Sequence, residues 1–343
     1  MNSTRNNSRT LPWLRLLRIA NLPSAIANIL MGFLLVHQSW SPTLELVLLI
    51  LASSSLYLAG MVLNDYYDFE VDLAQRPGRP LPANQISRNA AGATGFTLLA
   101  AGIVFACLAG WMINPAENFD PDSNLLLSSR LRPALIAAVL ALFVLLYDGP
   151  LKRTIAAPFL MGGCRTLNVL LGASTFFRPL AATEFGTNNE WCLLGLPAIV
   201  WWVAIAIGAL ITGATLLGRN EAVEAQPRGP LVVAGVMILA GLAGLAFVVY
   251  CPTATISISK QMKTVYPIFI GLISLTIIRR VGSAVATAKP QHIQQGVVSI
   301  LRSLILLDAS ACFLAVPTNP AFALTVFALM APTLLLGRWV PST

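Results

Sequence analysis

The sequence is poor in charged residues. Only 10% of its 343 residues are charged, whereas 56% are hydrophobic. A chain with so few charged residues has too little polar surface to cover a water-soluble globule of this size. The composition therefore excludes a soluble enzyme and predicts a polytopic membrane protein.

Cysteine is scarce as well, and its spacing forms no motif. The five cysteines lie singly in apolar stretches, with no CxxC pair among them. This pattern favours free, buried thiols over disulfides or a metal site. The start of the chain also lacks the small-residue cleavage site of a signal peptide, because the polar residues 1–10 run directly into Trp13-Leu14-Arg15. We therefore expect the first span to remain in the membrane.

Long apolar stretches, in contrast, are abundant. About 20 such residues are needed to cross a bilayer as a helix. Ten candidate spans lie near residues 19–38, 44–66, 90–112, 133–147, 155–177, 194–217, 230–250, 264–280, 296–316 and 320–338. The sequence therefore predicts an all-α, polytopic membrane bundle of nine or ten transmembrane helices. We expect one domain over residues 1–343, with a cytoplasmic tail at residues 1–16.

The net charge of +8 is spread over short loops, so it predicts no nucleic-acid partner. With the N-terminus in the cytoplasm, the inner loops hold most of the basic residues, among them Arg76, Arg153 and Arg279, while the outer loops mix both signs. This distribution satisfies the positive-inside rule. The segments after the second, fourth and sixth spans then emerge together in the cytoplasm, and these segments carry the polar motifs.

The first motif, at the end of the second span, is Asn64-Asp65-Tyr66-Tyr67-Asp68-Phe69-Glu70-Val71-Asp72. The last turn of a helix carries a partial negative charge, so carboxylates gathered there need a bound cation. On a helix, Asn64, Asp68 and Asp72 stand at i, i+4 and i+8, and this oxygen-rich face suits a hard divalent cation. The predicted Mg²⁺ ligands are Asn64, Asp65, Asp68 and Asp72.

Basic residues follow these acids. Arg76 and Arg79 stand three apart on the proline-rich segment 76–82, in a fork that suits phosphate oxygens. After the fourth span, Tyr147 offers an aromatic ring to a cation and Lys152 offers a further phosphate contact. The alternative interpretation of both segments is an ordinary membrane boundary with basic and aromatic anchors. Next to the acids, however, the arginines supply the phosphate-binding half of a metal diphosphate site, and the acids supply its metal-binding half.

Polar side chains also occur within the predicted spans. Arg165 and Asn168 stand at i and i+3 in the fifth span, where a charged residue is expected to face a polar cavity. A polar stripe on the first span consists of Arg18, Asn21, Ser24 and Asn28. Helix packing is the alternative explanation for the amides and the serine. We favour a cavity lining, because both spans approach the same cytoplasmic end.

A second acidic pair, Glu221 and Glu224, follows the sixth span at i and i+3. Its position after an apolar span matches that of the first motif, although a solvated helix end is the alternative. We expect these glutamates to activate or deprotonate an acceptor. Asp308, inside the ninth span, is left without a predicted role.

Together these motifs resemble the UbiA superfamily of intramembrane aromatic prenyltransferases. The resemblance extends over residues 17–308 and rests on the NDxxDxxxD motif at 64–72, on Arg79-Pro80-Leu81 and on the segment 147–152. It implies helices around a central cavity that opens into the bilayer. It also implies that the first motif binds Mg²⁺ and the diphosphate of an isoprenoid donor, with Arg79 and Lys152 at the phosphates.

The chain departs from the family pattern after the sixth span. Hydroxybenzoate and homogentisate prenyltransferases carry a second DxxxD segment there, whereas this chain has Asn220-Glu221-Ala222-Val223-Glu224. This change, together with Met161-Gly162-Gly163-Cys164-Arg165-Thr166-Leu167-Asn168, is similar to the EboC-like branch. Members of that branch occur in a bacterial cluster associated with secondary-metabolite precursors. The resemblance therefore implies a bacterial inner membrane.

The sequence thus predicts a Mg²⁺-dependent prenyltransferase that moves an isoprenyl group from an allylic diphosphate to an aromatic or other lipophilic acceptor. Tyr66, Tyr67 and Tyr147 are expected to stabilise the allylic cation. The predicted catalytic residues are Asp65, Asp68, Asp72, Lys152, Glu221 and Glu224. The predicted substrate-binding residues are Asn21, Asn64, Arg76, Arg79, Tyr147, Lys152, Arg165 and Asn168.

Two other classes of function compete with this prediction. A UbiA-like protein with an altered second motif could bind or transport an isoprenoid or hydrophobic precursor without turning it over. A secondary transporter would instead place ionisable residues or broken helices near the bilayer midplane. Most of the charge here clusters at one face, which favours the first two classes over the transporter.

Overall fold

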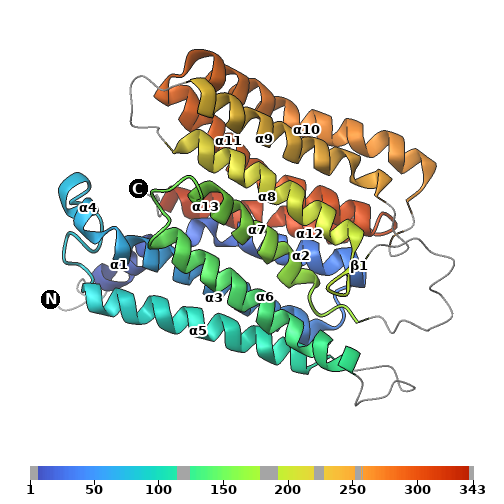
Figure 1. Ribbon diagram of the computed structural model, residues 1–343, viewed down its shortest axis with the longest axis horizontal. Coiled ribbons are helices and arrows are strands. Elements are labelled where there is room, and N and C mark those ends of the chain that lie inside the picture. Colours follow the sequence, from blue (N-terminus) through green and yellow to red (C-terminus); the bar gives the residue numbers. More distant parts are fainter. Residues whose placement is uncertain are drawn as a thin grey trace.

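The computed structural model describes residues 7–113, 124–177, 192–219, 228–251, 256 and 258–339. These residues form a bundle of long helices that lie side by side (Figure 1). Eight of the described helices are long and apolar enough to cross a membrane, by length and composition. The predicted all-α, polytopic bundle is therefore confirmed.

The first half of the chain supplies the helices that surround the acidic motif. Their bounds are α1 (Asn7–Leu16), the 3-10 turn η1 (Ile19–Asn21), α2 (Leu22–His37), α3 (Thr43–Tyr67), α4 (Phe69–Gln75), α5 (Arg88–Trp111), α6 (Asn124–Asp148) and α7 (Ala157–Ala173). The predicted tail is partly ordered, since α1 ends at Leu16, whose side chain is buried with Val62 and Leu81.

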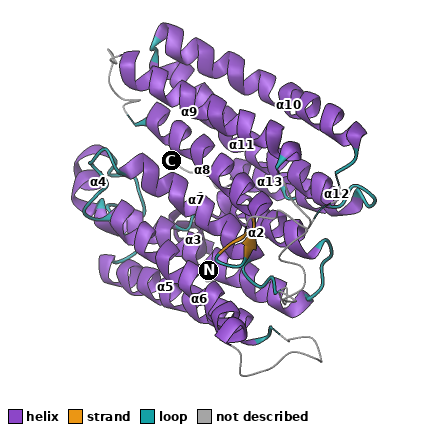
Figure 2. Ribbon diagram, turned by 45° about the vertical axis from the view of Figure 1, so that its right-hand side comes forward, coloured by secondary structure: helices purple, strands orange, loops and turns teal. Residues whose placement is uncertain are grey.

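The second half begins with a two-residue hairpin, in which β1 (Cys192–Leu193) pairs antiparallel with β2 (Leu196–Pro197). Helices make up nearly all of the remaining described chain (Figure 2). Their bounds are α8 (Ala198–Gly218), α9 (Arg228–Phe247), the 3-10 turn η2 (Val248–Tyr250), α10 (Lys260–Thr287), α11 (Pro290–Ala315), α12 (Ala321–Ala328) and α13 (Met330–Trp339).

Each predicted span falls on a helix, but two of the helical segments are short. α7 has 17 residues, and it carries Arg165 within its apolar sequence. The last predicted span, near 320–338, is divided between α12 and α13, with the break at Leu329. The apolar part of this pair, Ala321–Gly337, is shorter than the eight full spans. The tenth predicted span therefore corresponds to this broken segment.

α2 occupies the interior of the bundle. In the first span, 78% of the apolar window is buried, compared with 28% for α10. Glycines allow α7 to approach α2 closely: a side chain at Gly172 would collide with the backbone of Ile29, and one at Gly32 with the carbonyl oxygen of Val169. Polar residues on α2 and α7 are therefore held against each other inside the protein.

Candidate active site

The acidic motif lies where α3 ends and α4 begins. Asp68 occupies the junction, with φ −80° and ψ 0°. Helical hydrogen bonds continue across it, because Asp68 N–H donates to the Asn64 carbonyl (3.0 Å) and Asp72 N–H donates to the Asp68 carbonyl (2.8 Å). The acids that we expected on one helical face are therefore divided between two helices. We call the end of the bundle that holds Asp65, Asp68 and Asp72 the acidic end.

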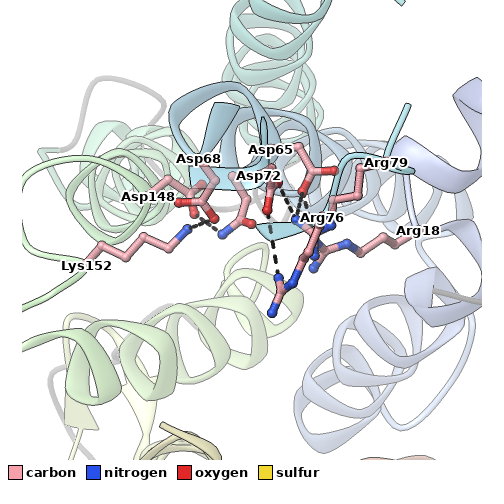
Figure 3. A network of polar contacts seen from close by, with 9 residues as sticks. Arg18, Asp65, Asp68, Asp72, Arg76, Arg79, Asp148 and Lys152 are labelled. Carbon is pink, nitrogen blue, oxygen red and sulfur yellow. Dashed lines mark hydrogen bonds and ion pairs between the residues drawn. The ribbon is translucent and has the colours of Figure 1, made fainter. Parts of the chain in front are cut away.

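Asp65 and Asp72 are buried beside two arginines from different segments (Figure 3). Arg79 Nη1 lies 2.6 Å from Asp72 Oδ2 and 3.4 Å from Asp65 Oδ1. Arg18, the residue before η1, donates through Nη2 to the same Asp65 oxygen at 2.8 Å. Arg76 stands further out, with Nη1 4.0 Å from Asp72. Burial of these carboxylates is tolerated because each one has a guanidinium partner.

A second polar group lies next to the first. Lys152 Nζ, on the segment after α6, donates to Asp68 Oδ2 at 2.6 Å. Asn64 Nδ2 donates to Oδ1 of the buried Asp148 at 3.0 Å. The close view shows Asp68, Asp148 and Lys152 together on one side, with the Arg18 and Arg79 pairs on the other (Figure 3). The acidic end therefore joins the end of α3 to the end of α6.

We expected these acids to need a bound cation, and in the structure basic side chains of the same chain pair with them. Four carboxylates, Asp65, Asp68, Asp72 and Asp148, lie among four basic side chains, Arg18, Arg76, Arg79 and Lys152. Among the described residues, no three Asp, Glu, His or Cys side chains are grouped as they would be in a metal site. The donor chemistry nevertheless fits Mg²⁺, since the acids and Asn64 offer only oxygen ligands to a hard cation.

A cavity of about 320 Å³ opens beside the acidic end. It lies among α2, α3, α6, α7, α11 and α13, and its walls combine apolar side chains with a few polar groups. Arg18, Asn64 and Asp148 line it, so the acidic end and the cavity are continuous. Most known small-molecule sites share this design of an apolar pocket with a few converging polar groups.

A buried polar network forms a deeper wall of the cavity. Arg165 on α7 donates to Asn28 Oδ1 (3.0 Å) and to Ser24 Oγ (3.1 Å), both on α2. Asn28 Nδ2 in turn donates to both carboxylate oxygens of Asp308 on α11, at 2.9 and 3.0 Å. Asp308, which had no predicted role, is fully buried. The network therefore connects three helices through one amide side chain.

Both the nitrogen and the oxygen of the Asn168 side-chain amide form hydrogen bonds with neighbouring helices. Its Nδ2 donates to the Ala25 carbonyl at 2.9 Å, and its Oδ1 accepts from Ser53 Oγ at 2.7 Å. It also lines the cavity. Asn168 thus joins α7 to α2 and α3. Helix packing, the alternative explanation given for the polar residues of these spans, therefore applies to Asn168.

The other predicted site residues that the structure describes lie in two kinds of environment. Asn21 and Tyr147 line the cavity. Arg76 is largely exposed at the rim of the acidic end. Glu221 and Glu224 lie outside the described residues. The structure therefore brings together the predicted residues of spans one to five and leaves the second acidic motif as a prediction.

The expected cation-stabilising rings are only partly in place. Tyr66 faces Arg88, whose guanidinium carbon lies 5.1 Å from the ring centroid, and Tyr67 is 41% exposed. Tyr147 and Tyr57 are the tyrosines that line the cavity. Tyr66 and Tyr67 point elsewhere because α3 presents Tyr57, Asn64 and Met61 to the cavity.

Sequence reasoning missed three residues of this site. Asp148 ends an apolar span in the same manner as the first motif, so its position was a usable signal. Arg302 is a charged residue within a predicted span, and it lines the cavity from α11. Tyr57 lies in the middle of an apolar stretch and gives no signal in the sequence.

Comparison with known proteins places this geometry in a family. The model of the UbiA prenyltransferase family matches residues 25–287 of the 343. The match begins on α2 and ends with α10, and it includes the whole acidic end apart from Arg18. The similarity to the EboC-like branch, which is a finer assignment, stays a prediction.

Relatives of the chain include archaeal enzymes. The digeranylgeranylglyceryl phosphate synthase of Saccharolobus solfataricus is 28% identical over 166 residues, which are 48% of this chain and 52% of that protein. The chain thus matches about half the length of this relative. The protein of the same name from Methanothermobacter thermautotrophicus is 25% identical over 276 residues, 76% of this chain and 86% of that protein.

A solved structure has the same fold. It is a UbiA homolog from Archaeoglobus fulgidus bound to GPP and Mg²⁺, with a TM-score of 0.55 and 16% sequence identity. The likeness covers 93% of this chain and 99% of that one. At this level of identity the comparison establishes the helical architecture alone.

Proposed function

Since the chain belongs to the UbiA prenyltransferase family, we propose that it is an enzyme that transfers an isoprenyl group from an allylic prenyl diphosphate to a lipophilic acceptor. It is an integral membrane protein. In this proposal the acidic end faces the cytoplasm, where soluble diphosphates are available, and the cavity opens toward the bilayer. The lysine and arginine residues at this end, among them Arg76, Arg79 and Lys152, support the orientation through the positive-inside rule.

The observation that carries the proposal is the alternation of acids and bases at the mouth of an apolar cavity. A metal diphosphate presents both signs of charge, so it can exchange partners with Arg79–Asp72 and Lys152–Asp68 without leaving a charge unpaired. The hydrocarbon chain of the donor then has the apolar walls of the cavity beside it. A site for a soluble, wholly polar ligand would not need this combination.

The residues that would hold Mg²⁺ are Asn64, Asp65, Asp68 and Asp72. The chemistry supplied by the bound ion is neutralisation of the charge that grows on the departing diphosphate. The A. fulgidus homolog, bound to GPP and Mg²⁺, supports the choice of metal. The oxygen-only donor set of this chain supports it independently.

The basic side chains have a separate task. Arg18, Arg79 and Lys152 would bind diphosphate oxygens once the aspartates contact the metal. Their positions on three segments, before η1, after α4 and after α6, allow them to approach one group from different sides. Tyr147, which lines the cavity, offers its ring to the allylic cation, and the apolar walls exclude water from that cation. Glu221 or Glu224 would deprotonate the acceptor.

The competing hypothesis is a protein that binds or transports an isoprenoid without transfer, with the altered second motif as the sign of lost catalysis. Both hypotheses use the same acidic end. They differ in whether the carbon–oxygen bond of the donor breaks. Release of diphosphate therefore separates them.

The test is release of diphosphate from labelled geranylgeranyl diphosphate by the purified protein in liposomes with Mg²⁺. Asp68→Asn should slow release about 100- to 1000-fold, because it removes one carboxylate that would hold the Mg²⁺ ion at the departing diphosphate. The Lys152–Asp68 pair, about a quarter exposed on each side, contributes only about 1 kcal/mol or less to stability, so this variant should fold. Glu70→Gln is the matched control, since Glu70 is an exposed acid two residues away.

Normal release by Asp68→Asn would contradict the proposed site. Tight donor binding by the native protein, with no release of diphosphate in the presence of membrane extract as acceptor source, would contradict the enzyme and support the binding protein. Loss of release in Glu70→Gln to the same degree would show that the motif acts only through its overall charge.

A further inference from the structure

A second hollow lies between α10 and α11, apart from the cavity of the candidate active site. We call it the α10–α11 hollow. It has a volume of about 350 Å³ and shares no lining residue with the cavity. Its lining residues are all polar: Thr276, Arg279, Arg280 and Ser283 on α10, with His292 and Gln295 on α11. Walls that carry guanidinium groups and no carboxylate create a positive potential, which suits an anion.

The helices around this hollow do not balance its charge. Within the described residues, no ion pair includes Arg279 or Arg280. α10 packs mainly against α9 and α11, and Asp308 is the only acidic residue in residues 228–315, which contain all three helices. Asp308 lies in the interior of the bundle, where it accepts from Asn28. These three helices therefore offer the two arginines no available carboxylate.

The two walls of the hollow are held together at one end. α10 ends at Thr287 and α11 begins at Pro290, so the connection between them is short. The Thr287 hydroxyl donates to the Ser283 carbonyl at 2.8 Å, and its oxygen lies 2.7 Å from Nδ1 of His292. This contact fixes the start of α11 beside the last turn of α10. The hollow is therefore formed by the fold before any ligand binds.

The α10–α11 hollow lies at the same end of the bundle as the acidic end. A side chain at Gly218, where α8 ends, would lie 3.4 Å from Val297 near the start of α11. Arg219, the next residue after α8, donates to the carbonyl of Arg153, which follows Lys152 of the acidic end. α10 is at the edge of the bundle in both views (Figures 1 and 2). The hollow is therefore on the outside of the bundle, where lipid surrounds a membrane protein.

Its depth corresponds to the head groups of a bilayer. α10 has 28 residues, roughly 42 Å, and a bilayer with its head groups is roughly 40–45 Å thick. Arg280 precedes Thr287, the last residue of α10, by seven positions, or roughly 10 Å, a depth from which an arginine reaches the head groups. Leu272, Leu275 and Ile278, further along the same helix, have exposed apolar side chains. A soluble anion would not contact these side chains, whereas the acyl chains of a lipid would cover them.

We propose that the α10–α11 hollow binds the phosphodiester head group of an anionic phospholipid, with Arg279 and Arg280 as its main contacts. Each guanidinium can present paired N–H donors to phosphate oxygens. Basic pockets between membrane helices are typical sites for anionic lipid head groups. Only 28% of the apolar window of α10 is buried, the lowest fraction among the candidate spans of the described chain. A lipid that contacts both α10 and α11 should therefore stabilise the outer part of the bundle.

The experiment is a titration of the purified full-length protein in detergent with two lipids, followed by native mass spectrometry. Dioleoylphosphatidylglycerol is the anionic probe, and dioleoylphosphatidylcholine has the same acyl chains without a net charge. The native protein should prefer the phosphatidylglycerol. Arg279→Gln and Arg280→Gln should each weaken its binding about tenfold or more, the effect of losing a charged hydrogen-bond donor. Both arginines are exposed, so the variants should fold, and binding of the phosphatidylcholine should change little.

Arg228→Gln is the matched control. Arg228 is an exposed arginine that begins α9, at the same end of the bundle, and it does not line the hollow. Its loss should leave the preference for phosphatidylglycerol unchanged. A loss as large as that of Arg280→Gln would show a diffuse attraction of the whole basic surface and would overturn the site. Equal binding of the two lipids by the native protein would overturn it as well.

Inorganic phosphate separates a lipid site from a site for a soluble anion. The titration with phosphatidylglycerol is repeated in the presence of inorganic phosphate at the concentration of the lipid. Phosphate should displace little of the lipid, because it makes no contact with the apolar surface of α10. Displacement of most of the lipid would assign the hollow to a soluble anion and overturn the proposal. Phosphatidylglycerol should also raise the thermal midpoint of the native protein more than that of Arg280→Gln, and an equal rise in both would contradict the proposed contact.

Discussion

The acidic end and the Arg165 network both remove ionised groups from water, yet they balance charge differently. At the acidic end, Asp65, Asp68 and Asp72 each have a basic nitrogen within 3.5 Å. In the network, the nearest polar partners of Arg165 are an amide and a hydroxyl. The first region contains paired acidic and basic side chains. In the second, Arg165 forms no ion pair with any of the described residues. This difference indicates which kind of ligand each region suits.

A region that contains both signs suits a ligand that also carries both. A metal ion and a diphosphate together can take the place of the existing ion pairs. The cost of removing these acidic and basic side chains from water has already been met when the chain folds. In the network, the Arg165 guanidinium and the Asp308 carboxylate are instead connected through the Asn28 amide. The comparison therefore separates a region of exchangeable ion pairs from a buried network that joins three helices, and variants that change one region should spare the other.

The largest expected effect comes from Arg79→Ala at the acidic end. This change leaves Asp65 and Asp72 buried, with only Arg18 and the distant Arg76 nearby. Breaking a buried pair in this way typically costs about 3–5 kcal/mol. We expect a clear fall in the thermal midpoint of the purified protein and loss of diphosphate release. An Arg79→Ala protein as stable as the native one would show that the acidic end is hydrated and not a buried ionic site.

Asp308→Ala should have the next largest effect. It leaves the Asn28 amide without its acceptor in a fully buried position, a loss of about 1–3 kcal/mol. Asp308→Asn keeps an acceptor oxygen and serves as the control, so it should recover most of the stability, as measured by thermal unfolding. Donor binding at the acidic end should remain normal in both variants. Weakened donor binding would mean that the two regions act as one site.

Lys152→Met should have the smallest effect on stability and a selective effect on function. The Lys152–Asp68 pair is about a quarter exposed on each side, and such pairs contribute about 1 kcal/mol or less. Loss of one charged contact to a phosphate should nevertheless raise the Kd for geranylgeranyl diphosphate about tenfold or more. Titration of the donor checks this. Unchanged donor affinity would remove Lys152 from the diphosphate site.

Much of the acidic end could be predicted from the sequence because its motifs are local. The run from Asn64 to Asp72 and the arginines after it are close along the chain, so their proximity follows from chain connectivity. The change of helix at Asp68 could not be predicted, since the periodicity of the acids fits one continuous helix. Asp308 could not be assigned either, because nothing near it in the chain indicates that its partner is Asn28.

The sequence by itself determined that this chain spans the membrane many times and carries acids and bases where apolar helices end. These are properties of run length and residue type, which need no knowledge of packing. Only the tertiary structure decided which polar and charged side chains are paired, because the decisive partners are far apart: 47 positions separate Arg18 from Asp65, and 280 separate Asn28 from Asp308. Close helix packing, and not local sequence, places Arg165 in a cavity among neutral partners.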